Sequence, residues 1–408
     1  MKPLGPIPAG YERIDGELAI GGRKASELVA DAGETPLFVY SAELIRRRVA
    51  QLRAAMPERL HIHYAVKANP YRPVLELMRA LVDGFDIASA GELEMALAAG
   101  QDPTLTSFAG PGKRDAELEA AIRHGVTLNL ESESEARRAL AIGERLGATP
   151  RLAIRVNPDF ELRGSGMKMG GGAKPFGIDA ERVPALAREV IAAGAEWRGL
   201  HIFTGSQALD AAAIAETQGN VLDLAARLTD EIGHELPHLN MGGGFGIPYF
   251  NGDQPLDVAA VGGALAERFA ALPAELAGTE FAIELGRYLV GEAGVYLARI
   301  VDRKDSHGQV FLVTDGGLHH QLAASGNFGT VVRRNYPAAI ATRFGEEPVE
   351  EASIVGCLCT PLDRLADQAL LPRAEEGDLV AIFCAGAYGA TASPAAFLGQ
   401  GPAREMLV

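Results

Sequence analysis

The sequence of 408 residues contains only three cysteines, Cys357, Cys359 and Cys384. They are too few and too clustered to form the disulfide framework of a small secreted protein. The N-terminal stretch, Met-Lys-Pro-Leu-Gly-Pro-Ile-Pro, also lacks the apolar core of a secretion signal. We therefore expect a protein of the reducing cytoplasm.

Long apolar runs and an excess of positive charge are missing too. No apolar run approaches the roughly 20 residues needed to span a bilayer. Hydrophobic residues make up 48% and charged residues 22% of the chain, the balance of a globular protein. The formal charge of -15 argues against nucleic acid or a membrane as a partner, since both favour a basic face. We expect neither partner, and no metal site is predicted.

From Thr35 onward the sequence alternates regularly between β-like and helical segments. Capping boxes open helices at Ser89 and Ser132, while Gly100 and Gly147 stop them. Eight β-like runs favour a closed (β/α)8 TIM barrel over an open doubly wound sheet, because no early G-x-G-x-x-G follows the first strand. The runs are 60–66, 84–88, 105–109, 126–130, 152–156, 200–203, 238–241 and 280–285.

After Gly286 the start and stop signals of helices become scarce. Segments 288–301, 309–314, 352–355 and 379–384 are typical of strands in a second, antiparallel domain, which the alternating N-terminal stretch at 11–20 is expected to join. We therefore predict an α/β protein with a barrel over residues 35–287 and a β-rich domain made of residues 1–34 with 288–408.

Lys67 is the residue on which the predicted function centres. It ends the apolar run 60–66 and precedes Asn69 and Pro70, which places it at a strand's C-terminal tip, where barrel enzymes collect their chemistry. Desolvation makes an amine the nucleophile that a Schiff base with an aldehyde cofactor requires. Taken alone, the residue reads more simply as a surface lysine whose stem covers apolar atoms.

Residues at other strand tips favour the functional interpretation of Lys67 over the surface lysine. Glycines 242–244 offer backbone N–H groups to a phosphate, or simply make a tight turn. Ser206 adds a hydroxyl donor or caps a helix, and Arg287 clamps an anion or forms a surface ion pair. Glu284 closes an apolar run, where a carboxylate needs a cation such as a protonated pyridine nitrogen. With Lys67, these are the parts that pyridoxal 5'-phosphate requires.

These motifs resemble those of the fold-type III pyridoxal-phosphate decarboxylases, the family of diaminopimelate and ornithine decarboxylases, whose barrel is related to that of alanine racemase. The resemblance covers nearly the whole chain. It rests on Tyr64-Ala-Val-Lys67-Ala-Asn69, Phe85-Asp86-Ile-Ala-Ser89-Ala-Gly91-Glu92, Gly199-Leu-His201-Ile-Phe203-Thr-Gly205-Ser206-Gln207, Gly242 to Gly244, Glu284-Leu-Gly286-Arg287, Gly356-Cys-Leu-Cys359-Thr360-Pro-Leu-Asp363 and Gly386-Ala-Tyr388-Gly389.

The resemblance implies α-decarboxylation of an amino acid, with a role for each matched residue. Lys67 would anchor the cofactor and Cys359 would protonate the α-carbon; alone, Cys359 reads as a small buried apolar residue. Family members are homodimers whose cysteine loop enters the partner's pocket, so two subunits would share each active site. The implied cofactor contacts are Lys67, Asp86, Arg155, Phe203, Ser206, Gly243, Gly244, Glu284, Gly286, Arg287 and Tyr388, and the implied substrate contacts are Arg287, Arg334, Thr360 and Asp363.

Three departures from the family pattern concern the substrate. Phe203 stands where the family usually has a histidine stacked on the pyridine ring. Thr360 replaces an acidic residue that receives a distal ammonium, which disfavours a dibasic substrate. The Arg-x-x-x-Tyr segment that holds diaminopimelate is not evident, and the region carries His319, His320 and Arg334 as candidates for the pocket entry. This pattern is similar to that of exosortase-A-associated pyridoxal decarboxylases and a carrier-tethered glutamate decarboxylase, which implies a substrate presented by an acyl carrier protein.

Three other functions stay open. One is diaminopimelate decarboxylation in lysine biosynthesis. A second is amino-acid racemisation, which is disfavoured because racemases of this fold place an arginine, not a carboxylate such as Glu284, against the ring nitrogen. The third is an inactive homologue that acts by binding a partner, and retention of Lys67, Glu284 and glycines 242–244 speaks against it.

Overall fold

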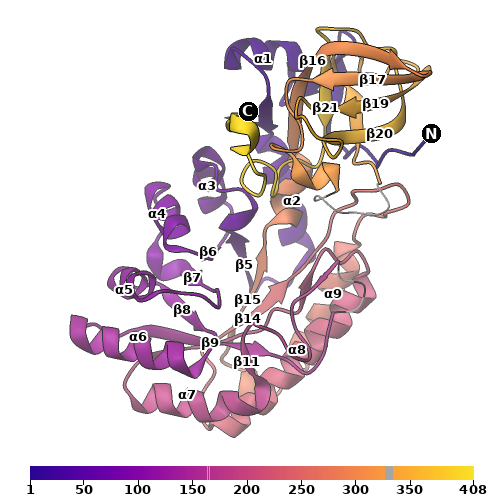
Figure 1. Cartoon of the computed structure of the whole chain (residues 1–408). Helices are drawn as coiled ribbons and strands as arrows, with labels where there is room; N and C mark the ends of the chain where they lie inside the picture. Colours follow the sequence, from indigo (N-terminus) through magenta and orange to yellow (C-terminus); the bar gives the residue numbers. More distant parts are fainter. Residues whose placement is uncertain (163, 165, 327–333) are drawn as a thin grey trace. The chain divides into compact units, whose positions relative to one another are not determined.

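The computed structural model describes residues 1–162, 164, 166–326 and 334–408, which form two compact units (Figure 1). Unit 1 comprises Met1–Arg48, Ile247–Pro255 and Arg287–Val408, and unit 2 comprises Val49–Gly246 and Leu256–Gly286. Unit 2 is a barrel and unit 1 is rich in β-strands, so the predicted fold class is confirmed.

Within its described residues, unit 2 is a closed barrel of eight parallel strands, with β15 paired to β5 and β8 paired to β9. Each strand overlaps one of the eight predicted runs. In ring order the strands are β5 (Leu60–Ala65), β6 (Gly84–Ile87), β7 (Thr106–Phe108), β8 (Thr127–Leu130), β9 (Arg151–Asn157), β12 (Glu196–His201), β14 (His238–Gly243) and β15 (Glu280–Leu285).

Helices connect these strands and begin where the capping residues predict. Ser89 and Ser132 each accept a hydrogen bond from the backbone N–H three residues on, and Gly147 ends its helix at a φ of 62°. The helices are α2 (Ala42–Ala55), α3 (Arg72–Arg79), α4 (Ala90–Ala98), α5 (Asp115–His124), α6 (Glu133–Leu146), α7 (Val183–Ala192), α8 (Ala211–Ile232) and α9 (Val258–Ala270); short strands β10 (Met167–Lys168), β11 (Ile178–Asp179) and β13 (Gly205–Ser206) complete the unit.

Strand β5 shows how the barrel separates apolar from polar side chains. Its alternation buries Leu60, Ile62 and Tyr64 completely or nearly so, whereas His61 and His63 alternate with them. Successive side chains of a strand point to opposite faces, so both histidines share the other face, which is the barrel interior. The same strand thus supplies the apolar outer wall and a polar inner surface.

Unit 1 is built on a mixed sheet that is mostly antiparallel, with β17 parallel to β19 and β22 parallel to β4. An apolar core that includes Leu28, Leu37, Val295 and Phe383 packs within this unit. Its elements are β1 (Glu12–Ile14), β2 (Glu17–Ile20), β3 (Arg23–Lys24), α1 (Ala25–Ala32), β4 (Leu37–Tyr40), α10 (Arg287–Val290), β16 (Gly294–Ser306), β17 (Gln309–Thr314), β18 (Ala338–Ile340), β19 (Glu350–Val355), β20 (Arg364–Leu371), β21 (Leu379–Ile382) and β22 (Arg404–Leu407).

Two predicted boundaries differ from the structure. The barrel was expected to begin at residue 35, but β4 pairs with β16 and β22 in unit 1, so unit 2 begins at Val49. The segment 288–301 is not one strand, because α10 and a 3-10 turn at Gly291–Ala293 precede β16. A short apolar run such as Tyr288-Leu-Val packs in a helix as readily as in a strand, so periodicity alone does not separate the two.

A membrane crossing would need a longer or more apolar helix than any in the described parts of the chain.

Candidate functional site

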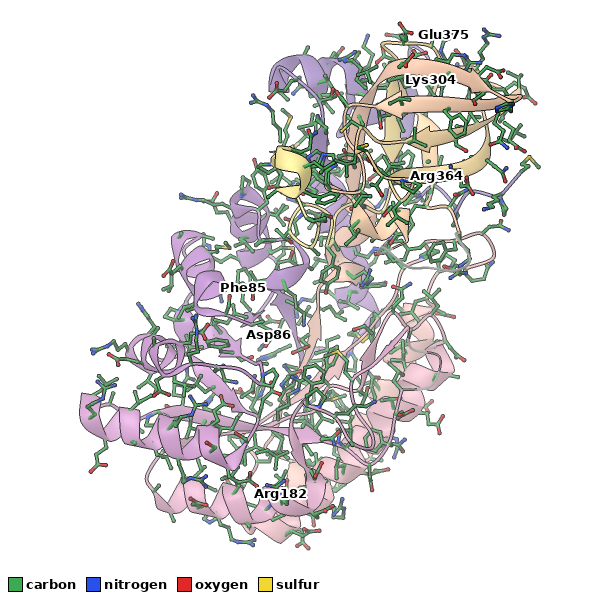
Figure 2. The ribbon with its side chains drawn as sticks, in the orientation of Figure 1. Phe85, Asp86, Arg182, Lys304, Arg364 and Glu375 are labelled. Carbon is green, nitrogen blue, oxygen red and sulfur yellow. The ribbon has the colours of Figure 1, made fainter. Side chains whose placement is uncertain are left out.

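A cavity of about 250 Å³ lies within unit 2, and we call it the Lys67 pocket. Because all the barrel strands are parallel, their carboxyl ends meet at one end of the barrel, and the polar lining residues lie at or just beyond those ends. Figure 2 shows one of them, Asp86, on the same strand as Phe85. The lining residues are Ala65, Lys67, Asp86, Ile87, Ala88, Ala109, Gly110, Pro111, Arg155, Met169, Phe176, His201, Phe203 and Glu284.

Lys67 lies on a 3-10 turn, Val66–Ala68, that directly follows β5. Gly286 stands beside this turn, where a Cβ atom would lie only 2.7 Å from the Cβ of Ala68. The lysine side chain is exposed, with its Nζ 5.8 Å from the centre of the Phe203 ring. The polypeptide alone therefore does not bury the amine as expected, but leaves it open to a molecule in the pocket.

Glu284 is buried and lines the Lys67 pocket from β15. Its Oε2 lies 3.1 Å from Nε2 of His201 and accepts a hydrogen bond of 3.3 Å from Nδ2 of Asn240. Burial pushes the pKa of Glu284 upward, but His201, Lys67 and Arg155 outweigh it and hold the pKa below its ordinary value. The pocket therefore contains an ionised carboxylate.

His201 is a partner that sequence reasoning did not assign to Glu284. It lies two residues before Phe203 in the sequence, and both side chains line the same pocket. That spacing was the available signal, because side chains two residues apart on an extended segment face the same way.

Asp86 is held by residues of neighbouring strands. Its Oδ1 accepts a short hydrogen bond from the Ser107 hydroxyl, whose oxygen accepts one of 3.1 Å from Nδ2 of Asn129. Its Oδ2 lies 3.5 Å from Nδ1 of His63. Neither of these last two atoms has a hydrogen-bond partner among the residues that the structure describes. Asp86 therefore brings an only partly satisfied carboxylate to the pocket.

Arg155 is fixed by Glu131, which the sequence analysis missed. Its Nη1 donates a 2.8 Å hydrogen bond to Oε1 of Glu131, and its guanidinium lies 5.0 Å from the centre of the Phe176 ring. Glu131 also accepts hydrogen bonds from the backbone N–H groups of Gly110 and Gly177. It directly follows the predicted strand 126–130, and a carboxylate that follows a run of buried strand residues was the available signal.

The glycines at the end of β14 are required by backbone packing. A Cβ on Gly243 would lie 2.0 Å from the carbonyl oxygen of Glu284, and one on Gly244, whose φ is +82°, would lie 2.2 Å from that of Gly205. This supports the tight-turn interpretation directly, and a phosphate contact remains a prediction. Ser206 lies in β13 and does not cap α8, because Asp210 occupies that position.

Other predicted residues belong to unit 1 and are described within it. Nη1 of Arg287 donates a 2.5 Å hydrogen bond to the Tyr249 hydroxyl, and its guanidinium lies 4.8 Å from the centre of the Tyr388 ring. Arg334 is exposed and stacks 3.8 Å from the centre of the Phe250 ring. Arg287 is therefore part of an aromatic cluster, not of a surface ion pair.

The cysteine loop also lies in unit 1. Cys359 is exposed, so it is not the buried apolar residue of the simpler interpretation. Asp363 is buried, and its carboxylate accepts backbone hydrogen bonds from Leu318 at 2.6 Å and Leu358 at 2.9 Å. The Thr360 hydroxyl accepts one from the backbone N–H of Leu362. Asp363 therefore holds this loop, and its contact with substrate stays a prediction.

The two histidines proposed for the pocket entry are buried in unit 1. Nδ1 of His320 lies 3.0 Å from the Tyr296 hydroxyl and its Nε2 lies 2.8 Å from the carbonyl oxygen of Gly401. The ring of His319 packs against that of His320, with 3.8 Å between the ring centres. Their contacts within this unit give no support for the predicted place at the pocket entry.

The residues around the Lys67 pocket fit pyridoxal phosphate. An accessible amine matches its aldehyde, the ionised carboxylate of Glu284 matches its ring nitrogen, and the ring of Phe203 offers an aromatic surface.

Comparisons with known proteins agree with this geometry. Residues 42–291 match the model of the pyridoxal-dependent decarboxylase family, pyridoxal binding domain. The L-glutamyl-[BtrI acyl-carrier protein] decarboxylase of Niallia circulans is 35% identical over 92% of this chain and 89% of its own length. The diaminopimelate decarboxylase of Methanothermobacter thermautotrophicus is 33% identical over 91% and 86%. The crystal structure of diaminopimelate decarboxylase from M. jannaschii with L-lysine superposes with a TM-score of 0.85 at 26% identity, over 98% of this chain and 93% of that one. The chain therefore belongs to the pyridoxal-dependent decarboxylase family.

Proposed function

We propose that this family member uses pyridoxal phosphate to remove the α-carboxyl group of an amino acid that an acyl carrier protein presents, and that it does so in the cytoplasm. The observation that carries the reaction is the meeting of Lys67, Asp86, Arg155, Phe203 and Glu284 in one cavity. The carrier is supported by the 35% identity to a decarboxylase whose named substrate is carrier-bound.

The cofactor, when bound, supplies an electron sink for the charge left on the α-carbon after carbon dioxide departs. Lys67 would hold its aldehyde carbon, and Glu284, ionised in the pocket, would keep a proton on its ring nitrogen. Phe203 would cover one face of the ring, since its own ring already faces the amine of Lys67. Asp86 and Arg155, which line the same pocket, would limit the space around the Lys67 amine and the cofactor ring.

The anchor is tested by reducing the purified protein with borohydride and mapping its peptides by mass spectrometry. Lys67 should carry the mass of a reduced pyridoxyl phosphate group, and the Lys67→Ala variant should carry none. Lys113 is the internal control, because its buried amine is paired with Glu135 at 2.7 Å and should stay unlabelled. A label on another lysine in place of Lys67 would mean that the anchor is misassigned.

The reaction is tested on a panel of free and carrier-bound amino acids, with loss of carbon dioxide as the readout. Decarboxylation of a carrier-bound amino acid alone supports the proposal, whereas equal activity on the free amino acid removes the basis for a carrier. Diaminopimelate decarboxylation is the second candidate, because relatives with that name are 33% identical. Turnover of free diaminopimelate would favour it, although the neutral Thr360 argues against a second ammonium group.

The two remaining alternatives have their own outcomes in the same experiments. Loss of optical rotation without carbon dioxide release would indicate a racemase. Absence of near-visible absorbance, unchanged by borohydride, would indicate an inactive homologue that binds a partner.

We also propose a homodimer in which Cys359 of one subunit completes the site around Lys67 of the other. The exposed thiol of Cys359 supports this proposal, because it is accessible to a second molecule. The remaining predicted contacts to cofactor or substrate stay predictions for site-directed variants: Gly243, Gly244, Ser206, Gly286, Arg287, Tyr388, Arg334, Thr360 and Asp363.

A further inference from the structure

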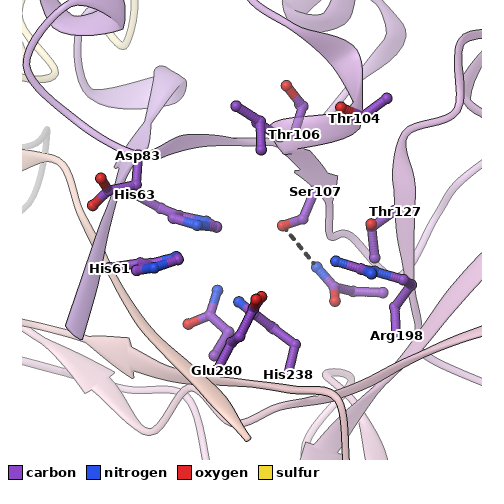
Figure 3. Close-up of a pocket in the computed structure, with 13 residues that line it drawn as sticks. His61, His63, Asp83, Thr104, Thr106, Ser107, Thr127, Arg198, His238 and Glu280 are labelled. Atoms are coloured by element: carbon purple, nitrogen blue, oxygen red, sulfur yellow. Dashed lines mark hydrogen bonds between the residues drawn. The ribbon is translucent and has the colours of Figure 1, made fainter. Parts of the chain in front are cut away.

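A second cavity, of about 210 Å³, lies in unit 2, and we call it the inner cavity (Figure 3). Apart from Leu105, every residue that lines it is polar. No group of three or more histidine, cysteine, aspartate or glutamate side chains in the described residues is placed to hold a metal ion, so a metal does not explain its histidines. The lining residues are His61, His63, Asp83, Thr104, Leu105, Thr106, Ser107, Thr127, Asn129, Arg198, His238, Asn240 and Glu280.

Residues of the inner cavity support both carboxylates of the Lys67 pocket. Asn240 donates a hydrogen bond of 3.3 Å to Glu284. Ser107 donates to Asp86 and accepts from an asparagine of the same cavity, the bond that Figure 3 draws as a dashed line from Ser107. His63 approaches Asp86 at 3.5 Å. The polar side chains of the inner cavity therefore form a layer that contacts the carboxylates of the Lys67 pocket.

His63 and Asp86 form the least satisfied contact in this layer. Nδ1 of His63 and Oδ2 of Asp86 face each other, and neither has a hydrogen-bond partner in the parts of the chain that the structure describes. The histidine ring is held in orientation, since it stacks on His238 with 5.9 Å between centres and an angle of 26°. Gly84 makes room for it, because a Cβ there would lie 2.8 Å from Nε2 of His63. A proton on Nδ1 would satisfy both buried atoms at once.

We propose that His63 is a positioning residue that, in its protonated form, holds the Asp86 carboxylate in place in the Lys67 pocket. This inference rests on the proposed function of the Lys67 pocket. His63 does not line that pocket itself, so it acts through Asp86 and from the side of the inner cavity.

The charges around His63 favour its protonation. Burial lowers its pKa, but Asp86 above all, with Asp83 and Glu284, raises it further than burial lowers it, so the net shift is upward. Burial and the neighbouring positive groups lower the pKa of His238 to about 3, which leaves that ring neutral. The titratable and charged groups that face His63 are Asp86, Asp83, Glu284, His61, His238, Arg198 and Glu280.

The sign of the pH dependence follows from the upward shift. The pairing with Asp86 is fully present below the ordinary histidine pKa of about 6.5 and is lost as the pH rises through the higher pKa of the folded protein. Loss of the proton from His63 changes the charge next to Asp86, which lines the Lys67 pocket. This changes the electric field around the cofactor, and the near-visible absorbance of the holoenzyme responds to that field.

The experiment titrates this absorbance in the wild-type holoenzyme, in His63→Gln and in the matched control His61→Gln. His61 lies two residues earlier on β5 and lines the same inner cavity, but it is not among the partners of Asp86. The wild type should show a step with its midpoint above about pH 6.5. His63→Gln should lose the step and His61→Gln should keep it. His63→Asn serves as a second variant should the glutamine variant not fold.

Two results would overturn the inference. One is an unchanged step in a folded His63 variant, and the other is an equal loss of the step in His61→Gln. Failure of the proposed function is distinct from both, because it appears in the wild type as the absence of near-visible absorbance and of a borohydride label on Lys67.

Discussion

Glu131 belongs to a group of four buried charged side chains, with Arg155, Lys113 and Glu135. It pairs with Arg155 at 2.8 Å, while Lys113 pairs with Glu135 at 2.7 Å. The formal charges of the four side chains cancel. The substitution Glu131→Gln keeps the volume and one acceptor, but it leaves a net positive charge and turns an NH2 group toward one of the N–H donors that Glu131 now binds.

The expected loss follows from burial. Removing one member of a buried pair costs about 3–5 kcal/mol, and the retained carbonyl places the expectation near 3 kcal/mol. For a unit of this size each kcal/mol lowers Tm by about 2–4 °C, so the transition of unit 2 should fall by about 6–12 °C. Burial pushes the pKa of Glu131 upward, but Arg155 and Lys113 with backbone hydrogen bonds outweigh it, so the pKa is lowered. The stability that Glu131 contributes is therefore present above its unfolded pKa of about 4.3 and is lost as the pH falls through the lower folded pKa.

Differential scanning calorimetry of the two proteins at pH 7 and at progressively lower pH measures this effect. The control is Glu119→Gln on α5, which removes an acid paired with Arg123 and Arg145 on the surface and should leave Tm nearly unchanged. Equal decreases in Tm for Glu131→Gln and Glu119→Gln at pH 7 would refute the reasoning. A difference in Tm between wild type and Glu131→Gln that stays the same at acid pH would also refute it.

Two further predictions concern the reaction itself. The substitution Glu284→Gln removes the ionised carboxylate but keeps an acceptor for the Asn240 side chain. Turnover should therefore fall by about a hundredfold with little change in KM. Unchanged turnover in steady-state assays would contradict the role of this carboxylate. Mixing inactive Lys67→Ala and Cys359→Ser subunits should restore about a quarter of wild-type activity, because half of the randomly formed dimers would contain one intact shared site; no recovery in a subunit-mixing assay would exclude shared sites.

The barrel and much of its pocket were predictable because the signals are local. The residues at the end of each strand can be identified from the local sequence pattern. A parallel barrel then brings the ends of its strands together, however far apart they lie in the sequence. Lys67, Asp86, Arg155, Phe203 and Glu284 therefore met in one cavity as the motifs implied.

Other features depend on distant pairings that no local pattern contains. Strand β4 reads like a barrel strand, and only its pairing with β16 and β22 assigns it to unit 1. His63 was read as part of the apolar run before Lys67, although it faces a polar cavity built from other strands. Asp363 sits in a family motif that implies a substrate contact, but its hydrogen bonds to the backbone N–H groups of Leu318 and Leu358 could not be read from the motif.

The pairing of β4 also bears on the order in which the chain folds during synthesis. One neighbour of β4 begins at Gly294 and the other at Arg404, so the ribosome makes this strand long before either partner. The barrel strands are complete by Leu285, which lets unit 2 form while β4 still has two unpaired edges. Such an edge is a template for pairing with other chains. The growing chain thus carries at least one unpaired edge of β4 from the synthesis of this strand until β22 is made.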